Sequence, residues 1–139
     1  MATSASLAPA PYRFTRDEYY RMVEAGFFHN KRVELLDGGI LTMSLQNSLH
    51  AATVYRVAHA LEQLIGNTTC VRCQLPIVLN DWSEPESDIT VCAPEPNDYG
   101  QAHPRPNQVL LLIEVADTNV SFDTVQKAAA YAASGILEL

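Results

Sequence analysis

Positive charge is scarce in this 139-residue chain. Lysine and arginine together number 9, against 16 aspartates and glutamates, and the formal net charge is −7 at pH 7. Two of the basic residues are lysines, Lys31 and Lys127. Proteins that bind nucleic acids by overall charge carry a basic patch, so this composition does not favour a general nucleic-acid binder. It does not exclude one, because a bound divalent cation would offset a cluster of carboxylates.

Long apolar runs and a secretion signal are also lacking. No stretch approaches the roughly 18 consecutive apolar residues that a membrane-spanning helix needs. The first residues are small and rich in proline, without the charged start and apolar core of a signal peptide. We therefore expect a cytoplasmic protein with a flexible leader over residues 1–12 and one domain over residues 13–139.

Cysteine is sparse and odd in number. Cys70 and Cys73 have CxxC spacing, but neither a second cysteine pair nor a histidine cluster completes a zinc site. The surrounding stretch alternates like a strand, in which residues three apart point to opposite faces. We expect Cys70, Cys73 and Cys92 to be structural thiols in a reducing cytoplasm.

Helical and strand-like patterns share the rest of the chain. Helices are predicted over residues 15–25, 48–64 and 121–133, the first opened by a capping box. Strands are predicted over residues 32–36, 40–43, 71–79, 88–92 and 108–115. Residues 81–87 are expected to form an acidic surface loop, and the proline-rich residues 94–106 a long loop. This order predicts an α/β or α+β fold, with a mixed β-sheet flanked by helices.

Two glycines mark predicted boundaries. Asp37-Gly38 is a hairpin turn between the first two strands, and Gly135 ends the last helix. Residues 136–139 then look like the first residues of a further strand. We therefore expect the C-terminal strand to be missing, so that the domain over residues 13–139 is truncated.

Three carboxylates stand in strand-like, mostly apolar stretches. Glu114 ends the run over residues 109–115, which is typical of a strand buried on both faces. A carboxylate there is costly unless it is paired or binds a metal, although it could mark the point where the strand leaves the core. Asp88 and Glu34 stand in similar stretches. The simpler interpretations are that Asp88 is a turn residue at the start of a strand and that Glu34 is an exposed residue on an edge strand. Together the three favour a shared acidic site.

Such a site suits phosphodiester hydrolysis. Hard divalent cations held by carboxylates activate water and relieve charge on the leaving oxygen. Without the cation, converging carboxylates repel one another. A nearby lysine can orient the water or stabilise the developing charge. Lys127 is the candidate, although a lysine on a helix is commonly solvated.

These residues resemble the Uma-two family of proposed bacterial endonucleases, within the restriction-endonuclease-like PD-(D/E)XK superfamily. The matching stretches lie in order at residues 33–38, 50, 84–89, 112–118, 127–131 and 134–139. The resemblance implies a restriction-endonuclease-like fold and metal-dependent hydrolysis of DNA. It implies that Asp88 and Glu114 bind Mg²⁺ or Mn²⁺, with Glu34 as a third ligand or a water-mediated contact. Lys127 would be the catalytic lysine, and Gln74 aligns next to the site.

Two positions depart from the superfamily pattern. Ser87, where proline is frequent, precedes Asp88. Ala116 occupies the usual lysine position two residues after Glu114, so the resemblance puts the lysine on the following helix. His50 is favoured as a capping or packing residue over a catalytic base.

Other interpretations stay open. The same fold could serve assembly or binding without catalysis. Hydrolysis of a small phosphorylated molecule is a third alternative, but the sequence has no glycine-rich phosphate-binding loop to support it. Tyr131 shares a helix face with Lys127 and could cover the lysine stem or fill the core. A solvated helix face or a phosphate-binding arm could explain the basic residues near the start: Arg13, Arg16, Arg21, Lys31 and Arg32. An incomplete sheet edge predicts a homodimer.

Overall fold

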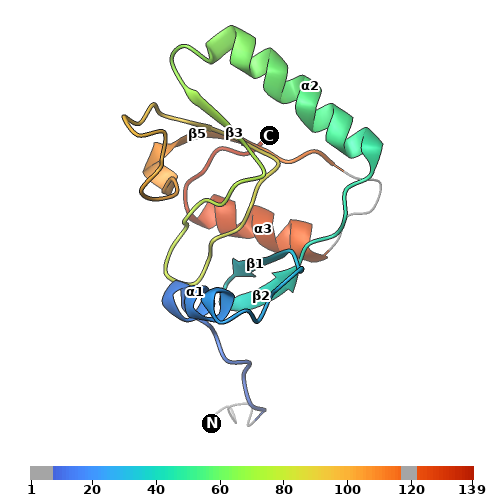
Figure 1. Ribbon diagram of the computed structural model, residues 1–139, viewed down its shortest axis with the longest axis vertical. Helices are drawn as coiled ribbons and strands as arrows, with labels where there is room; N and C mark the ends of the chain where they lie inside the picture. The colour runs from blue at the N-terminus through green and yellow to red at the C-terminus, as the bar shows by residue number, and fades with distance from the viewer. Residues whose placement is uncertain (1–7, 117–121) are drawn as a thin grey trace, which may run out of the picture.

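The structure is a computed structural model that describes residues 8–116 and 122–139, with only the backbone of residues 122–123 (Figure 1). The helices in these residues are α1 (Arg16–Glu24), α2 (Ser48–Ile65), α3 (Phe122–Ala133) and the short 3-10 helix η1 (Pro106–Gln108). The strands are β1 (Val33–Leu36), β2 (Gly39–Thr42), β3 (Cys70–Cys73), β4 (Ile89–Cys92) and β5 (Val109–Ile113). No helix in this described part is long and apolar enough to cross a membrane.

One antiparallel sheet, in the order β3-β4-β5, lies between two helices. Its α2 face carries Ile89 and Ile113, which pack with Val54 of α2. Its α3 face carries Leu112, which packs with Tyr131 of α3. This alternation follows from the two-residue period of strands, since each covered face needs its own apolar set. The predicted α/β architecture with flanking helices is confirmed.

The last residues of the chain add a parallel pairing to this sheet. Leu112 of β5 forms a parallel bridge with Glu138. The N–H of Leu112 donates to the carbonyl of Leu137 at 2.9 Å, and the N–H of Leu139 donates to the carbonyl of Leu112 at 2.8 Å. The strand-like character predicted for residues 136–139 is therefore correct, although they join the antiparallel sheet through one isolated parallel bridge.

A separate hairpin, β1-β2, lies beside α1. Its turn has Asp37 at φ 48° and Gly38 at φ 79°, as the predicted Asp-Gly turn requires. A Cβ on Gly38 would lie 2.4 Å from the Cβ of Arg13, so close approach of the N-terminal segment also demands glycine. Thr15 forms the predicted capping box with Glu18 at the start of α1.

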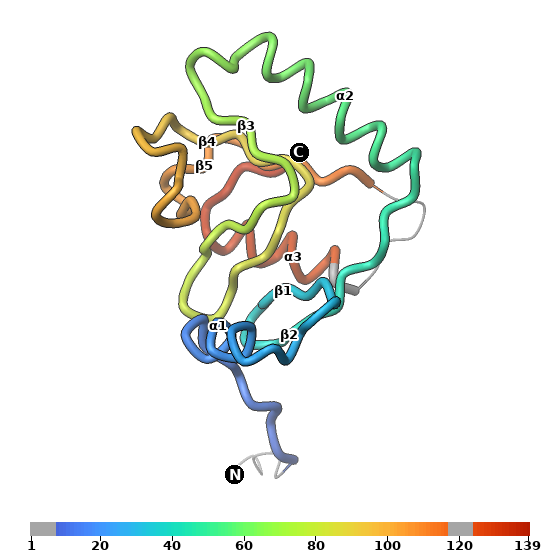
Figure 2. The backbone as a smooth tube through the Cα atoms, viewed as in Figure 1, coloured from blue at the N-terminus to red at the C-terminus, as the bar shows by residue number. Residues whose placement is uncertain are grey.

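The acidic segment at residues 81–87 joins the hairpin to the sheet. The expectation of a surface loop holds for Asp81 and Trp82, which are exposed, and is wrong for residues 83–87. Ser83, Glu84 and Ser87 are buried. The N–H of Glu84 donates to the carbonyl of Leu35 at 2.8 Å, so the segment pairs with β1 like a strand. Figure 2 shows residues 74–88 as a long hairpin that reaches from β3 and β4 to α1. Burial comes from partners distant in sequence, which composition alone does not reveal.

Two predicted strands are shorter than expected. The alternating stretch at residues 71–79 is regular only to Cys73, because Gln74 has a φ of 53° and Pro76 lacks an N–H. The run at residues 108–115 is a strand over Val109–Ile113, and Leu110 is 51% exposed, so it is not buried on both faces throughout.

Candidate active site

Four separate elements carry the predicted site residues. Glu34 belongs to β1, Asp88 directly precedes β4, Glu114 directly follows β5, and Lys127 belongs to α3. The termini of β4 and β5 are neighbours because the two strands pair with Ile89 opposite Ile113. Asp88 and Glu114 therefore lie at the same end of the paired strands β4 and β5.

Lys127 lies between two of the carboxylates. Its Nζ is 3.4 Å from Oε2 of Glu34 and 3.6 Å from Oε1 of Glu114. It also donates to the backbone carbonyl of Glu86 at 2.5 Å. The lysine side chain is 13% exposed. The interpretation of Lys127 as a solvated helix residue is therefore wrong.

Glu34 is buried, with 5% of its surface exposed, so it is not an exposed edge residue. Its Oε2 accepts the N–H of Glu86 at 3.0 Å, in addition to its ion pair with Lys127. Glu86 thus holds both partners, the lysine through its carbonyl and the carboxylate through its N–H. Sequence reasoning gave Glu86 no role, and backbone contacts of this kind leave no signal in the residue type.

Asp88 is fixed from two sides. Its Oδ2 accepts the N–H of Val115 at 2.8 Å, which ties it to the end of β5. Its Oδ1 lies 3.1 Å from Nε2 of His50, and both side chains are nearly buried. The backbone N–H of His50 donates to Oδ1 of Asn47 at 2.8 Å, so Asn47 and not His50 caps α2. The His50 ring packs against Asp88 instead.

Glu114 has an unusual protonation equilibrium. Burial raises its pKa, the ammonium of Lys127 opposes this, and the charge of Asp88 and its hydrogen bond raise the pKa further, to about 7. The hydroxyl of Tyr131 donates to Oε1 of Glu114 at 3.1 Å. The like charge of Asp88 therefore opposes the ionisation of Glu114.

The sequence matches the Uma2 family, described as "Putative restriction endonuclease", over residues 16–139. The chain belongs to the Uma2 family. The resemblance to the Uma-two family is thereby confirmed, with a match that contains all four predicted site residues. No curated protein matches this chain.

A solved structure similar to this Uma2 chain is titled "Crystal structure of a putative nuclease belonging to DUF820 from Anabaena variabilis ATCC 29413". The two share 17% sequence identity and superpose with a TM-score of 0.61. The match covers 83% of this chain and 65% of that protein's chain. At this identity the likeness shows a shared fold.

The donor set of the Uma2 chain suits a divalent cation only in part. Within residues 8–116 and 122–139, no group of three or more His, Cys, Asp or Glu side chains is arranged to hold a metal. Asp88 and Glu114 nevertheless adjoin each other, since they flank the paired residues Ile89 and Ile113 and Asp88 acts on Glu114 through charge and a hydrogen bond. Mg²⁺ is usually bound through one or two carboxylates, with waters and substrate phosphates as further ligands. The pair fits such an ion, and direct ligation by Glu34 stays a prediction.

The basic residues near the start are largely engaged within the protein. Arg13 pairs with Asp37, Arg16 pairs with Glu84 at 3.0 Å, and Arg32 pairs with Glu86 at 3.0 Å. Arg21 donates to the carbonyl of Asp17 at the edge of hydrogen-bond distance, 3.5 Å. Such partners weaken the interpretation of this region as a phosphate-binding arm.

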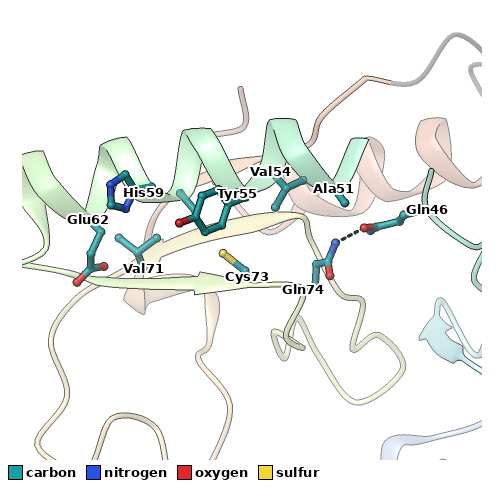
Figure 3. A pocket seen from close by; sticks show the side chains of 10 residues that line it. Gln46, Ala51, Val54, Tyr55, His59, Glu62, Val71, Cys73 and Gln74 are labelled. Atoms are coloured by element: carbon teal, nitrogen blue, oxygen red, sulfur yellow. Dashed lines mark hydrogen bonds between the residues drawn. The ribbon is translucent and has the colours of Figure 1, made fainter. Parts of the chain in front are cut away.

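A groove of about 400 Å³ lies between α2 and β3 (Figure 3). Val54, Val71 and Cys73 contribute to its lining. At one end, the side-chain amide of Gln74 donates to Gln46 at 2.6 Å. The N–H of Gln74 donates to the carbonyl of Asp88 at 3.1 Å, so Gln74 lies next to the site, as aligned. All three cysteines are free thiols.

Proposed function

We propose that this Uma2-family chain is a metal-dependent endonuclease that hydrolyses phosphodiester bonds in DNA. The observation that carries the proposal is Lys127, a nearly buried ammonium between Glu34 and Glu114, beside the Asp88–Glu114 pair. Carboxylates and one lysine at a shared point are the groups that this hydrolysis needs. The family description and the fold of a proposed nuclease support the same activity.

In this proposal Asp88 and Glu114 hold Mg²⁺ or Mn²⁺, with Glu34 as a third ligand or a contact through water. The ion supplies Lewis acidity and a lowered pKa for the attacking water. The protein side chains around the ion orient the attacking water and offset the negative charge of the phosphate. Lys127 donates hydrogen bonds from Nζ toward a phosphate oxygen or the attacking water, where negative charge develops. Glu34 and the carbonyl of Glu86 hold that ammonium in place at the site.

A catalytically silent domain used for assembly or binding is the second candidate. The observation in its favour is the internal satisfaction of the site, since Lys127 has three protein partners. Asp88 likewise has the N–H of Val115 and the ring of His50. Structural ion-pair networks show the same features as catalytic ones.

Cleavage of supercoiled plasmid in manganese separates the two candidates. The informative variant is Lys127→Arg, because alanine would leave two carboxylates without their cation and endanger folding. Arginine keeps the charge, but its planar fork does not replace a compact ammonium. We expect the wild type to cleave and Lys127→Arg to be about 100-fold slower. Equal cleavage by both would contradict the role of Lys127, and wild-type inactivity would favour the silent domain.

The matched control is Arg56→Lys. Arg56 is an exposed basic residue of α2, and this variant makes the reverse exchange between the same two side chains. It should cleave at the wild-type rate. If the melting temperature of a variant changes by less than about 3 °C, unfolding does not explain its slower cleavage, because such a shift corresponds to a loss of only about 1 kcal/mol in the free energy of unfolding.

A further inference from the structure

Helix α3 places two functional groups on one carboxylate. Lys127 and Tyr131 are four residues apart, so they lie on the same face of α3. Nζ of Lys127 is 3.6 Å from Oε1 of Glu114, and the hydroxyl of Tyr131 is 3.1 Å from the same oxygen. Both contacts from α3 therefore hold Oε1.

The ring of Tyr131 has a packing role that does not require its hydroxyl. The residue is fully buried, in a cluster with Ile77, Leu79, Leu112 and Ile136. Phenylalanine would fill the same volume without a polar atom. The hydroxyl must instead find a partner in this interior, and that partner is Glu114.

Glu114 is a flexible side chain at a position where orientation matters. It directly follows β5, and Asp88 acts on it through charge and a hydrogen bond. Two carboxylates can share one cation only if their oxygens converge, and an unrestrained glutamate has several rotamers. Hydrogen-bond partners of metal-binding carboxylates restrict this freedom, and their removal typically costs about 10–100-fold in metal affinity.

We propose that Tyr131 is a positioning residue: its hydroxyl holds Oε1 of Glu114 and so fixes this carboxylate to bind one divalent cation together with Asp88. The inference rests on the proposed function, because it needs the carboxylate pair to bind Mg²⁺ or Mn²⁺. In this proposal Tyr131 does not contact the substrate. Its ring contributes to the core, and its hydroxyl contributes to the affinity for the ion.

The test is manganese binding, measured by isothermal titration calorimetry on the wild type and on Tyr131→Phe. The matched control is Tyr99→Phe. Tyr99 is also buried and its hydroxyl donates to a protein oxygen, the carbonyl of Ala93 at 2.5 Å, outside the acidic site. Both variants lose one buried hydroxyl, but only one loses a contact to Glu114.

We expect the manganese Kd to rise at least tenfold in Tyr131→Phe and to stay within twofold of the wild type in Tyr99→Phe. In a Glu114→Gln background, Tyr131→Phe should cause no further loss of affinity, because the oxygen that the hydroxyl orients is no longer a carboxylate. A manganese Kd of Tyr131→Phe equal to the wild-type value would overturn the inference and leave the proposed function standing. Absence of manganese binding by the wild type would overturn both.

Discussion

The guanidinium of Arg16 in α1 lies on the carboxylate of Glu84, with Nη2 3.0 Å and Nε 3.2 Å from Oε1. Glu84 is 4% exposed, and its other oxygen accepts the hydroxyl of Tyr20. The two residues are 68 positions apart, so this pair fastens α1 to the buried segment that joins the hairpin and the sheet.

Removal of this arginine should destabilise the protein strongly. Arg16→Met keeps most of the aliphatic stem but leaves a buried carboxylate without its cation, which costs about 3 kcal/mol. The melting temperature should fall by roughly 6–12 °C. Arg13→Met is the control, because the Arg13–Asp37 pair is exposed and worth about 1 kcal/mol or less. Equal losses in both variants would contradict a special role for Arg16.

The raised pKa of Glu114 predicts a stability that falls as pH rises. Unfolded glutamate ionises near 4.5, whereas burial and Asp88 hold the folded pKa at about 7. The protonated form stabilises the fold below about pH 4.5, and this contribution is lost as pH rises to about 7. Glu114→Gln cannot ionise. In the absence of metal it should therefore gain stability relative to the wild type between pH 5 and pH 8.

Urea denaturation at pH 5 and at pH 8 measures the difference in the free energy of unfolding between Glu114→Gln and the wild type. The control is Glu62→Gln, a variant of an exposed glutamate on α2, whose stability should follow the wild type at both pH values. If the difference between Glu114→Gln and the wild type were the same at pH 5 and pH 8, Glu114 would not be the group that titrates.

The sequence allowed prediction of the elements whose signals are local. The capping box at Thr15 and the Asp37-Gly38 turn specify their own backbone conformations, and both occur as predicted. The covering of the sheet by helices also follows from periodicity, because each apolar face needs a partner. Identification of Glu34, Asp88, Glu114 and Lys127 depended on the family resemblance as well as on apolar surroundings.

What sequence could not supply were contacts between distant residues. Glu84 and its neighbours read as an acidic, solvated loop, although Arg16 and Tyr20 make its burial possible. Likewise, Glu86 reaches the site through its backbone, and His50 reaches Asp88 across 38 positions. These partners are set by tertiary packing, which no local pattern of residue types encodes.

His103 predicts a loss of stability in mild acid. Its Nδ1 lies 3.2 Å from Nη2 of Arg72, which can only donate, so Nδ1 must be unprotonated. Burial lowers the pKa of His103, as do Arg72 and Arg16, while Glu84 opposes them. Since the unfolded state binds a proton near pH 6.5, stability is fully present above that pH and falls below it.

His103→Gln keeps an acceptor for Arg72 but does not titrate, so its melting temperature should vary less between pH 7.5 and pH 5.5 than that of the wild type. The control is His59→Gln, which removes an exposed histidine stacked on Tyr55. A wild-type pH dependence in His103→Gln would assign the acid sensitivity to other groups.

The homodimer predicted from the sequence has a candidate surface on α2. Leu49, Tyr55 and Leu64 are 73%, 69% and 80% exposed, and Tyr55 also lines the groove against β3. A large apolar side chain exposed beside a groove, as Tyr55 is, is typical of an interaction site. Tyr55→Glu should therefore convert a dimer to a monomer in sedimentation velocity at high micromolar concentration. Val125→Glu, which places the same charge on α3, should not, and a monomeric wild type would contradict the prediction.

The last prediction concerns the ligands of the cation. If Asp88 and Glu114 bind it, millimolar manganese should raise the wild-type melting temperature, because a ligand that binds only the folded state stabilises it. Asp88→Asn and Glu114→Gln should each lose most of this rise. An unchanged rise in both variants would place the ion elsewhere in the protein.

Glu34→Gln decides whether Glu34 is a direct ligand. Glu34 is held by Lys127 and by the N–H of Glu86, and the structure gathers no three carboxylates around one point in the part of the chain that it describes. We therefore expect Glu34→Gln to keep more than half of the manganese-induced rise, as a water-mediated contact would. Since this variant also deprives Lys127 of a partner, the rise must be taken from its own metal-free melting temperature. A loss as complete as that in Asp88→Asn would instead mean that Glu34 moves onto the ion when it binds.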